Sequence, residues 1–288
     1  NMNSKSKLVK KGKIGVFDSG FGGLSILKHI VKKLPEYDYL YFGASARAQY
    51  GEKSHATILK FTKEALVFMF NSGCEIVVLA CNSASSEALR EIQQKFLPKY
   101  FPDKKVLGVI IPTVEKVLEE RQNKKIAVLA TNATVRTGTF VKEIQKRKPQ
   151  VFVNQVACPL LVPLVESGKE KSKEAEVAVR DYLSCLKKEK IDALILGCTH
   201  YEFLSSVIKK NIGKKVKVFS EGSIVAVKFK DYLKRHIEIE EKLSKKGKVE
   251  FFITKPSSEF DIFGSKFFGS QIHADNVKLS NVPQKKTI

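Results

Sequence analysis

Cysteines are the residues of this 288-residue chain with the clearest capacity for chemistry. The chain has five cysteines, an odd number, and none stand in C-x-x-C spacing. This argues against a disulfide framework and for a reducing compartment such as the cytoplasm. Cys81 and Cys198 are each followed directly by polar residues, as Cys-Asn-Ser and Cys-Thr-His. A helix N-terminus lowers a thiol pKa from about 8.5 toward neutrality, so both could supply thiolates. Cys74, Cys158 and Cys185 are interpreted as small core residues.

The two cysteines belong to a wider set of small polar residues that follow apolar runs. In parallel α/β sheets, ligands bind beyond the carboxyl ends of the strands. Hydroxyls, amides and helix N-termini at such ends can bind carboxylate oxygens. Four segments of this kind occur, at Asp18–Gly20, Cys81–Ser83, Thr131–Thr134 and Cys198–His200. They predict a binding site for an anionic small molecule.

Alternating apolar runs and amphipathic segments predict the elements that position these residues, in a parallel α/β arrangement. Apolar spacing of three and four from Leu24 to Leu34 predicts a helix that ends before Pro35, and residues 57–70 predict a second. Another helix carries Leu89, Ile92 and Phe96. The predicted strands are Lys13–Phe17, Tyr39–Phe42, Ile76–Ala80, Val106–Ile110, Ile126–Leu129 and Ala193–Leu196.

Two pairs of segments resemble each other at nearly equal offsets, which indicates an internal duplication. Lys13–Gly20 resembles Lys125–Asn132, and Ile76–Ser83 resembles Ala193–His200. We therefore expect two similar three-layer α/β domains with mostly parallel sheets, pseudo-symmetric, with the active site in the cleft between them. Each domain would bring one cysteine, Cys81 or Cys198, to the cleft. Two thiols flanking one cleft suit proton transfer on opposite faces of a single carbon.

The charge of the chain gives weaker guidance. The formal net charge is +21, but most of the 51 basic residues are Lys scattered along the chain, and no nucleic-acid motif accompanies them. A solvated, lysine-rich surface with a basic tail in residues 1–12 is favoured, and nucleic acid is not an expected partner. A positive field favours an anionic substrate. No apolar run is long enough for a membrane span or a signal peptide.

Other chemistries fit the motifs less well. The five His form no metal-ligand spacing, so no metal is expected. The segment from Gly20 to Ser25 approximates a dinucleotide loop but lacks its third glycine, and no acidic residue ends the following strand. A phosphate-binding P-loop motif is absent from the sequence. A cysteine hydrolase using Cys198 and His200 remains open, although residues two apart on one turn need not meet.

Several segments resemble a known family. Asp18–Gly23, Ala80–Ser85 and Leu196–Tyr201 resemble the signature segments of the glutamate racemases, in the aspartate/glutamate racemase superfamily. Three further segments, at Tyr41–Gly51, Ala157–Glu166 and Phe251–Thr254, also resemble motifs of that family. The resemblance extends from about Lys13 to Gly269 with the segments in the same order.

The resemblance implies cofactor-independent interconversion of L- and D-glutamate in the bacterial cytoplasm, supplying D-glutamate for peptidoglycan. It implies that Cys81 acts on D-glutamate and Cys198 on L-glutamate, assisted by Asp18 and His200 respectively. The remaining positions matching the family's substrate-binding residues are Ser19, Tyr50, Gly51, Asn82, Ser83 and Thr199, besides Asp18 and His200. The resemblance leaves open the roles of Thr131, Thr134 and Glu166.

The chain also departs from the family pattern. Ala44 replaces a usual Asp, Gln49 and Glu202 replace usual prolines, and Ser83 replaces a Thr while keeping the hydroxyl. Tolerated drift in a working enzyme is favoured over loss of activity. The alternatives kept open are an aspartate racemase and a catalytically degenerate paralogue acting as a binding protein.

The domain bounds expected from the family fold are discontinuous. The first domain comprises residues 13–111 and 224–275, the second residues 112–223, and the tails residues 1–12 and 276–288. The sequence leaves the oligomeric state open, with a homodimer as one option, and a small molecule is the expected partner.

Overall fold

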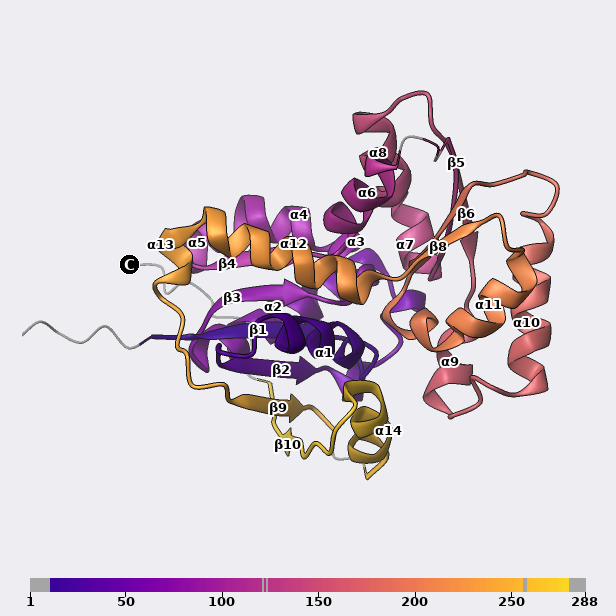
Figure 1. The fold of residues 1–288 in the computed structure, drawn as a ribbon. Helices are drawn as coiled ribbons and strands as arrows, with labels where there is room; N and C mark the ends of the chain where they lie inside the picture. The colour runs from indigo at the N-terminus through magenta and orange to yellow at the C-terminus, as the bar shows by residue number, and fades with distance from the viewer. Residues whose placement is uncertain (1–10, 121, 123, 256–257, 280–288) are drawn as a thin grey trace, which may run out of the picture.

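A computed structural model describes residues 11–120, 122, 124–255 and 258–279, arranged around two parallel sheets (Figure 1). The first sheet has the order β10-β9-β2-β1-β3-β4 and the second has the order β6-β5-β7-β8. All pairings between these strands are parallel. The strands are β1 (Lys13–Asp18), β2 (Tyr39–Gly43), β3 (Cys74–Leu79), β4 (Lys105–Gly108), β5 (Lys125–Ala130), β6 (Phe152–Ala157), β7 (Ala193–Gly197), β8 (Lys217–Phe219), β9 (Val249–Ile253) and β10 (Asp275–Asn276).

The first sheet is the middle of three layers because its strands send successive side chains to opposite faces. Ile14 and Val16 of β1 join a core with α1 (Leu24–Lys33) and α12 (Glu221–Arg235). Phe17 joins a second core on the other face, which includes α2 (His55–Asn71). In Figure 1, α12 runs from the second sheet back across the first. The shorter helices of this part are α3 (Asn82–Glu87), α4 (Leu89–Glu91), α5 (Leu97–Tyr100), α13 (Ile237–Glu240) and α14 (Ser258–Phe268).

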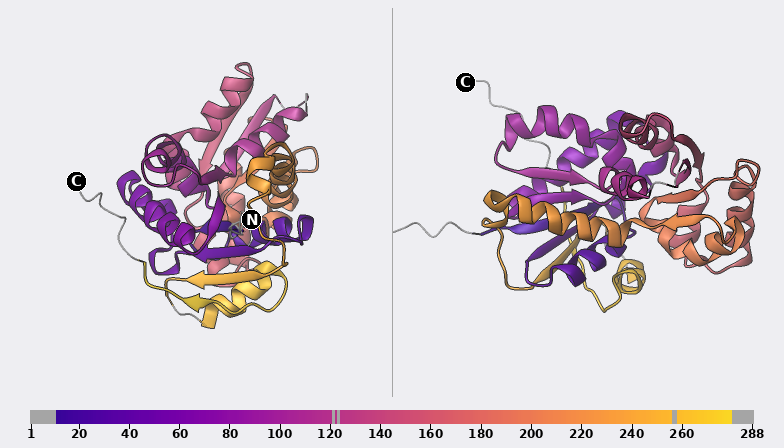
Figure 2. Two further views of the ribbon diagram at one scale, coloured as in Figure 1. Left: turned by 90° about the vertical axis from the view of Figure 1, so that its left-hand side faces the viewer. Right: turned by 45° about the horizontal axis from the view of Figure 1, so that its top comes forward.

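The second sheet is built in the same way. Val128 of β5 and Ile195 of β7 face a core that holds apolar residues of α6 (Ile110–Glu119) and α8 (Thr139–Arg147). Leu129 and Leu196 face the opposite core, with residues of α10 (Lys173–Ser184). The helices that complete this part are α7 (Asn132–Thr137), α9 (Leu161–Glu166) and α11 (Ser205–Ile212). Figure 2 shows the two sheets and their helices from two further sides.

The strand orders confirm the expected fold class of two similar α/β units. The order β2-β1-β3-β4 in the first sheet repeats as β6-β5-β7-β8 in the second, and β9 and β10 extend only the first. In this correspondence β1 matches β5 and β3 matches β7, which are the strands whose sequences resemble each other. The repeated design therefore places Cys81, just after β3, and Cys198, just after β7, at equivalent points. The expected bounds of the domains stay a prediction.

Some predicted elements differ from the structure. The strand predicted to extend to Ile110 is wrong at its end, because β4 stops at Gly108 and Ile110 begins helix α6. The helix predicted around Ile92 is interrupted: α4 is followed by a π-helical turn, Ile92–Phe96, and then by α5. The predicted basic tail lies outside the described residues except for Lys11 and Gly12. At the other end, Asn276 is part of β10.

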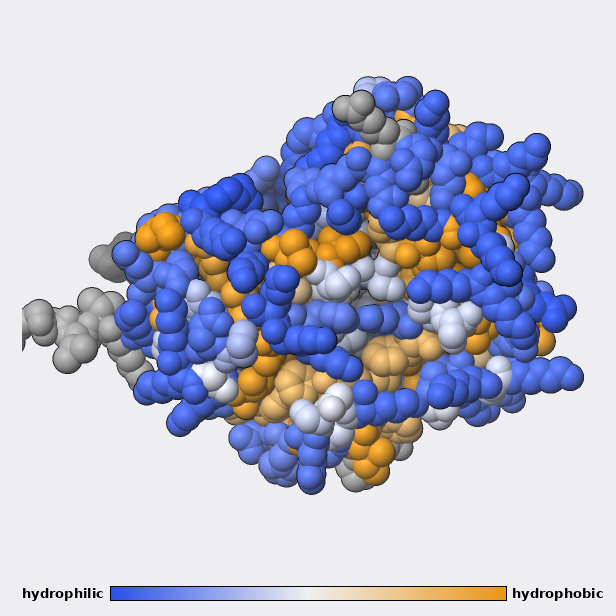
Figure 3. Space-filling model, viewed as in Figure 1, coloured by the Kyte–Doolittle hydropathy of each residue, from blue (hydrophilic) through white to orange (hydrophobic). Residues whose placement is uncertain are grey.

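Hydrophilic side chains cover most of the face drawn in Figure 3, with apolar patches between them. Many surface lysines are paired with carboxylates, including Lys116 with Glu119 at 2.8 Å and Lys210 with Glu176 at 3.1 Å. Exposed pairs of this kind contribute little to stability. None of the described helices is both long and apolar enough to cross a membrane.

Candidate active site

A cavity of about 30 Å³ brings together all of the residues that the sequence singled out for catalysis and substrate binding. A single water needs about 10–15 Å³ of such volume, so the cavity has room for two or three. Its walls come from the loops and helices that follow β1, β2, β3, β5, β6 and β7. The lining residues are Asp18, Ser19, Gln49, Tyr50, Gly51, Cys81, Asn82, Ser83, Thr131, Val162, Glu166, Cys198, Thr199 and His200.

Cys81 lies on one side of the cavity, at the N-cap of α3. The Ala84 backbone N–H donates to Cys81 Sγ at 3.5 Å, and the thiol donates to Ser19 Oγ at 3.6 Å. Asp18 is almost fully buried nearby, and its Oδ2 accepts the Gly20 N–H at 2.9 Å. Cys81 therefore has a carboxylate and a hydroxyl as its polar neighbours.

Burial and the Asp18 charge raise the pKa of the Cys81 thiol to about 12, because both disfavour a second negative charge. Hydrogen bonds from the Ala84 N–H and with Ser19 act in the opposite direction and are outweighed. The expectation that a helix N-terminus would leave this thiol with a lowered pKa is therefore wrong for Cys81. Cys81 rests as a neutral thiol, a proton donor.

Cys198 lies on the other side of the cavity and has different neighbours. Its Sγ is 3.8 Å from Nδ1 of His200, and Thr199 Oγ1 is 3.3 Å from the same nitrogen. The other ring nitrogen, Nε2, is 3.1 Å from Glu166 Oε1. The 3₁₀ helix Thr199–Leu204 fixes this arrangement, and it brings Cys198 and His200 into contact although they are two residues apart.

His200 is buried, which disfavours its charged form, but its contacts with Cys198 and Glu166 outweigh that cost. They raise the pKa of His200 well above its usual value. The protonated His200 ring therefore lies between the carboxylate of Glu166 and the sulfur atom of Cys198. Glu166, whose role the sequence left open, is thus the partner that holds His200.

The other predicted binding residues line the same cavity. Ser83 Oγ and Thr131 Oγ1 are 2.8 Å apart, which joins the end of β3 to the end of β5. Asn82 donates from Nδ2 to Glu221 Oε2 at 2.6 Å. The Tyr50 hydroxyl is buried and has no hydrogen-bond partner within the described part of the chain. Gly51 is required where it stands, because a Cβ there would come within 2.7 Å of Thr131 Cβ.

The glycine-rich loop after β1 brings the two halves into contact. A Cβ on Gly22 would lie 2.6 Å from the His200 ring and closer still to Thr199 Oγ1. Gly23 packs against Asp18, where a Cβ would come within 2.6 Å of the Asp18 Cβ. Gly22 thus allows close packing between the two halves, and Gly23 allows close packing against Asp18 within the first.

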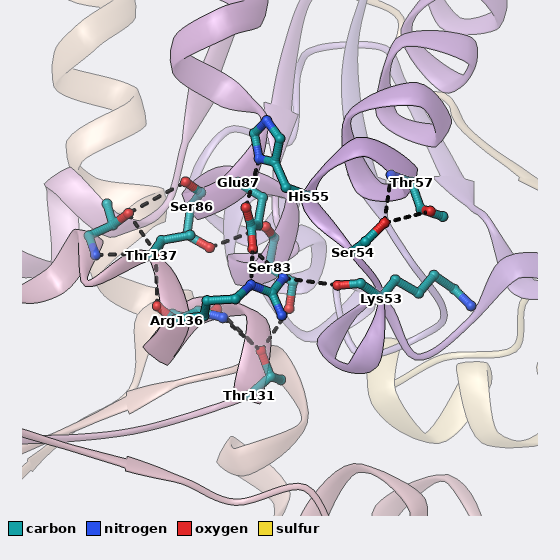
Figure 4. A network of polar contacts seen from close by, with 12 residues as sticks. Lys53, Ser54, His55, Thr57, Ser83, Ser86, Glu87, Thr131, Arg136 and Thr137 are labelled. Atoms are coloured by element: carbon teal, nitrogen blue, oxygen red, sulfur yellow. Dashed lines mark hydrogen bonds and ion pairs between the residues drawn. The ribbon is translucent and has the colours of Figure 1, made fainter.

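A polar network beside the cavity also ties the halves together (Figure 4). Arg136 of α7 contacts the buried carboxylate of Glu87 on α3 and donates to the Lys53 carbonyl at 2.9 Å. His55 Nδ1 lies 2.8 Å from the other Glu87 oxygen. Because Cys81 is the N-cap of α3 and Thr131 is the N-cap of α7, this network fixes the relative position of two cavity walls.

The residues that depart from the family pattern lie in three different parts of the structure. Ala44 is buried in a hydrophobic core and does not line the cavity. Gln49 lines the cavity with a left-handed φ of 61°, a conformation closed to proline, so this part of the loop is built differently. Glu202 contacts His29 Nε2 at 3.4 Å outside the cavity.

Sequence reasoning missed two residues at the site. Val162 of α9 lines the cavity, and Glu221 of α12 contacts Asn82 from behind it. Val162 lies in the Ala157–Glu166 segment, where a single apolar residue does not stand out, and Glu221 belongs to no motif that the sequence offers. Cys74 and Cys158 are buried and Cys185 is exposed, all away from the cavity. Across the described residues, no group of three or more His, Cys, Asp or Glu could hold a metal ion.

Comparisons with known proteins agree with the geometry. The Asp/Glu/Hydantoin racemase family model matches residues 14–228. A glutamate racemase of Persephonella marina is 37% identical over 269 residues, covering 93% of this chain and 98% of the relative.

Solved structures lead to the same family. A glutamate racemase isoform from Bacillus anthracis superposes with a TM-score of 0.85 at 31% identity, covering 94% of this chain and 98% of that one. A glutamate racemase from Francisella tularensis, solved with D-glutamate, gives a TM-score of 0.83 at 31% identity over 93% and 98% of the chains. The chain therefore belongs to the glutamate racemases of the Asp/Glu/Hydantoin racemase family, which are isomerases.

Proposed function

We propose that this chain interconverts L- and D-glutamate with two thiols as the only acid–base pair that acts on the α-carbon, and without a cofactor. The observation that carries the proposal is that Cys81 and Cys198, from equivalent strand ends of two repeated units, line one cavity. D-glutamate in the Francisella tularensis relative supports the choice of substrate. D-glutamate made in the cytoplasm would supply peptidoglycan synthesis.

The protonation states of the two sides suit catalysis that begins from L-glutamate. Cys198, beside the His200 imidazolium, takes the α-proton as a thiolate, and the C–H electron pair stays on Cα. Cys81, a neutral thiol in the resting cavity, gives its proton to the opposite face of Cα. D-glutamate forms, Cys198 is left as a thiol and Cys81 as a thiolate, and D-glutamate reacts by the reverse steps.

The carbanion is the difficult part of this reaction, because the α-proton of an amino acid is a very weak acid. Fixed dipoles are the main means by which a site without water stabilises such charge, because their attraction to the developing charge is strongest in the transition state. Ser19, Ser83 and Thr199 bring hydroxyls to the cavity wall. The lining residues in the described part of the chain include no Lys or Arg, so the lysine excess does not enter the site.

Substrate binding itself helps Cys81 to cycle between its two forms. Asp18 is the charge that holds the Cys81 pKa high after burial. The α-ammonium of glutamate, entering a cavity that contains Asp18, offsets that negative charge. The pKa of the thiol then falls toward the working range that general acid–base catalysis requires.

The test is chiral chromatography of purified protein incubated with each glutamate enantiomer. We expect racemisation in both directions with equal kcat/KM, since enantiomers have equal free energies, and far less turnover of aspartate. Activity should persist after treatment with hydroxylamine and dialysis, which removes pyridoxal phosphate. Absence of racemisation of either enantiomer contradicts the proposal, and dependence on added cofactor contradicts its cofactor-free part.

A further inference from the structure

Glu221 is a buried carboxyl that the mechanism above does not use. It stands in the first turn of α12, the helix that leads from the second sheet back to the first, and only 4% of it is exposed. Its Oε2 accepts a hydrogen bond from Asn82 Nδ2 at 2.6 Å. Burial raises the pKa of Glu221 to about 8, but a carboxyl group keeps an accepting oxygen in either protonation state.

This hydrogen bond decides which end of the Asn82 amide is left for a ligand. Nδ2 donates one of its two hydrogens to Glu221, and Oδ1 is buried without a partner among the described residues. Asn82 lines the cavity, whereas Glu221 lies outside it. A buried, unpaired carbonyl oxygen costs free energy unless a donor reaches it, so Asn82 Oδ1 calls for a donor from a ligand.

Zwitterionic glutamate has a single donor group, its α-ammonium, because both of its carboxylates only accept. We propose that Glu221 is a positioning residue that turns the Asn82 amide so that Oδ1 accepts a hydrogen bond from the substrate ammonium. This inference rests on the proposed function, since it assigns a substrate group to the same cavity.

Packing against helix α1 keeps Glu221 in place. Gly222 follows it and packs against His29 of α1, whose ring lies where a Cβ on residue 222 would stand. His29 in turn contacts Glu202, next to the Cys198 segment. Glu221 is therefore anchored by α1 and α12 together, and its contact with Asn82 joins the Cys81 side of the cavity to that anchor.

The experiment swaps donor and acceptor in the hydrogen bond between residues 82 and 221, using substitutions of nearly the same size and shape. Four proteins are compared: wild type, Asn82→Asp, Glu221→Gln, and the double variant. In Asn82→Asp two carboxyl groups face each other, and we expect KM for glutamate to rise more than tenfold with a smaller change in kcat. In the double variant the amide introduced by Glu221→Gln can donate to the new carboxylate, whose second oxygen still accepts in the cavity. We expect its KM to return to within tenfold of wild type.

The double variant separates this proposal from its competitors. A KM no lower than that of Asn82→Asp overturns the proposal, because it shows that Glu221 does not act through residue 82 or that residue 82 donates to a substrate carboxylate. Circular dichroism melting checks the fold of all four. If Asn82→Asp alone does not fold, a double variant within tenfold of the wild-type KM supports the proposal and a larger KM overturns it.

The wild-type assay keeps this result apart from the proposed function. If wild type does not racemise glutamate, the proposed function fails and this inference fails with it. If wild type racemises glutamate and the double variant does not recover its KM, only the role of Glu221 fails. Glu221→Gln alone keeps an oxygen that can accept from Asn82, so a rise in its KM as large as that of Asn82→Asp would overturn the proposal.

Discussion

The Cys81 side and the Cys198 side of the cavity occupy equivalent positions in two repeated units but have opposite electrostatic surroundings. Each cysteine follows the strand that pairs with the central strand, β3 beside β1 and β7 beside β5. Cys81 faces the carboxylate of Asp18, and Cys198 faces the imidazole of His200. The repeated design explains where the two sulfur atoms lie, and the polar groups beside them differ.

This difference matters for the proposed reaction because its substrate and product are mirror images. A single protonation state of the two cysteines cannot act on both enantiomers. A pair of identical sites would leave both sulfurs in the same protonation state, and inversion needs one acceptor and one donor. Burial and the neighbouring Asp18 keep a proton on Cys81, and the raised pKa of His200 places a protonated ring beside Cys198. The chemical asymmetry is thus imposed on a symmetrical backbone.

Removing either sulfur should have the largest effect. Cys81→Ala and Cys198→Ala should each lower kcat/KM for racemisation by at least about 10³-fold, since each loses the general acid or base for one face. Proton NMR in D2O sharpens the comparison, because the remaining base can still exchange one enantiomer. We expect Cys81→Ala to exchange only L-glutamate and Cys198→Ala only D-glutamate. Racemisation at the wild-type rate in either variant would remove the two-base assignment.

Exchanging the charged neighbours should shift the thiol titration of one side at a time. Asp18→Asn removes the charge that raises the Cys81 pKa, so the thiolate fraction at about pH 9 should rise at least tenfold. Thiolate ultraviolet absorbance as a function of pH measures this. The matched control is His200→Asn, which leaves Asp18 in place and should not lower the Cys81 titration. An unchanged profile in Asp18→Asn would show that burial alone sets the proton on Cys81.

Glu221 is not one of the polar neighbours described for either cysteine. Because it is buried, its ionisation should change the free energy of unfolding in a known direction. Its pKa is raised from 4.5 to about 8 by burial, so its contribution to stability is complete below about pH 4.5 and is lost as pH rises toward 8. Glu221→Gln does not ionise, and its stability relative to wild type should increase by about 3–4 kcal/mol between pH 5 and pH 8. Urea unfolding at both pH values measures it. The control is Glu241→Gln at an exposed site, and equal pH responses in the two variants would contradict the burial of a neutral Glu221.

Ala44→Asp should have the smallest effect on activity. Ala44 lies at the end of β2, where its N–H donates to the Asp18 carbonyl at 3.0 Å, but its side chain does not reach the cavity. We expect kcat/KM within about threefold of wild type, with a lower melting temperature because a carboxyl would be buried without a partner. A large loss of kcat/KM without unfolding would show that this loop acts on Asp18.

The buried parts of the fold could be predicted from the sequence, and the edges could not. β1, β3, β5 and β7 are continuous apolar runs because both of their faces are covered. β6 lies at an edge, is only partly buried and carries Asn154 and Gln155, so its pattern does not stand out. β8 is too short to give a period. The strand predicted to extend to Ile110 is wrong there because apolar residues continue across the junction into α6.

The site is predictable where residues stand in motifs at strand ends. Cys81, Cys198, Asp18 and His200 follow from such motifs, and all four line the cavity. Glu221 could not be found, because a single Glu in an amphipathic helix looks like a surface residue. The sequence predicts the Cys81 pKa in the wrong direction, since it shows the local helix end and hides both the burial and the Asp18 contact.

The volume of the cavity has a kinetic consequence. About 30 Å³ accommodates two or three waters, and glutamate has ten non-hydrogen atoms, so the resting form must open before it can be loaded. Observed association rates should then level off at high glutamate concentration, at a ceiling set by how often the walls separate. Compounds that hold the cavity walls apart would bind an open conformation that the resting protein adopts only transiently.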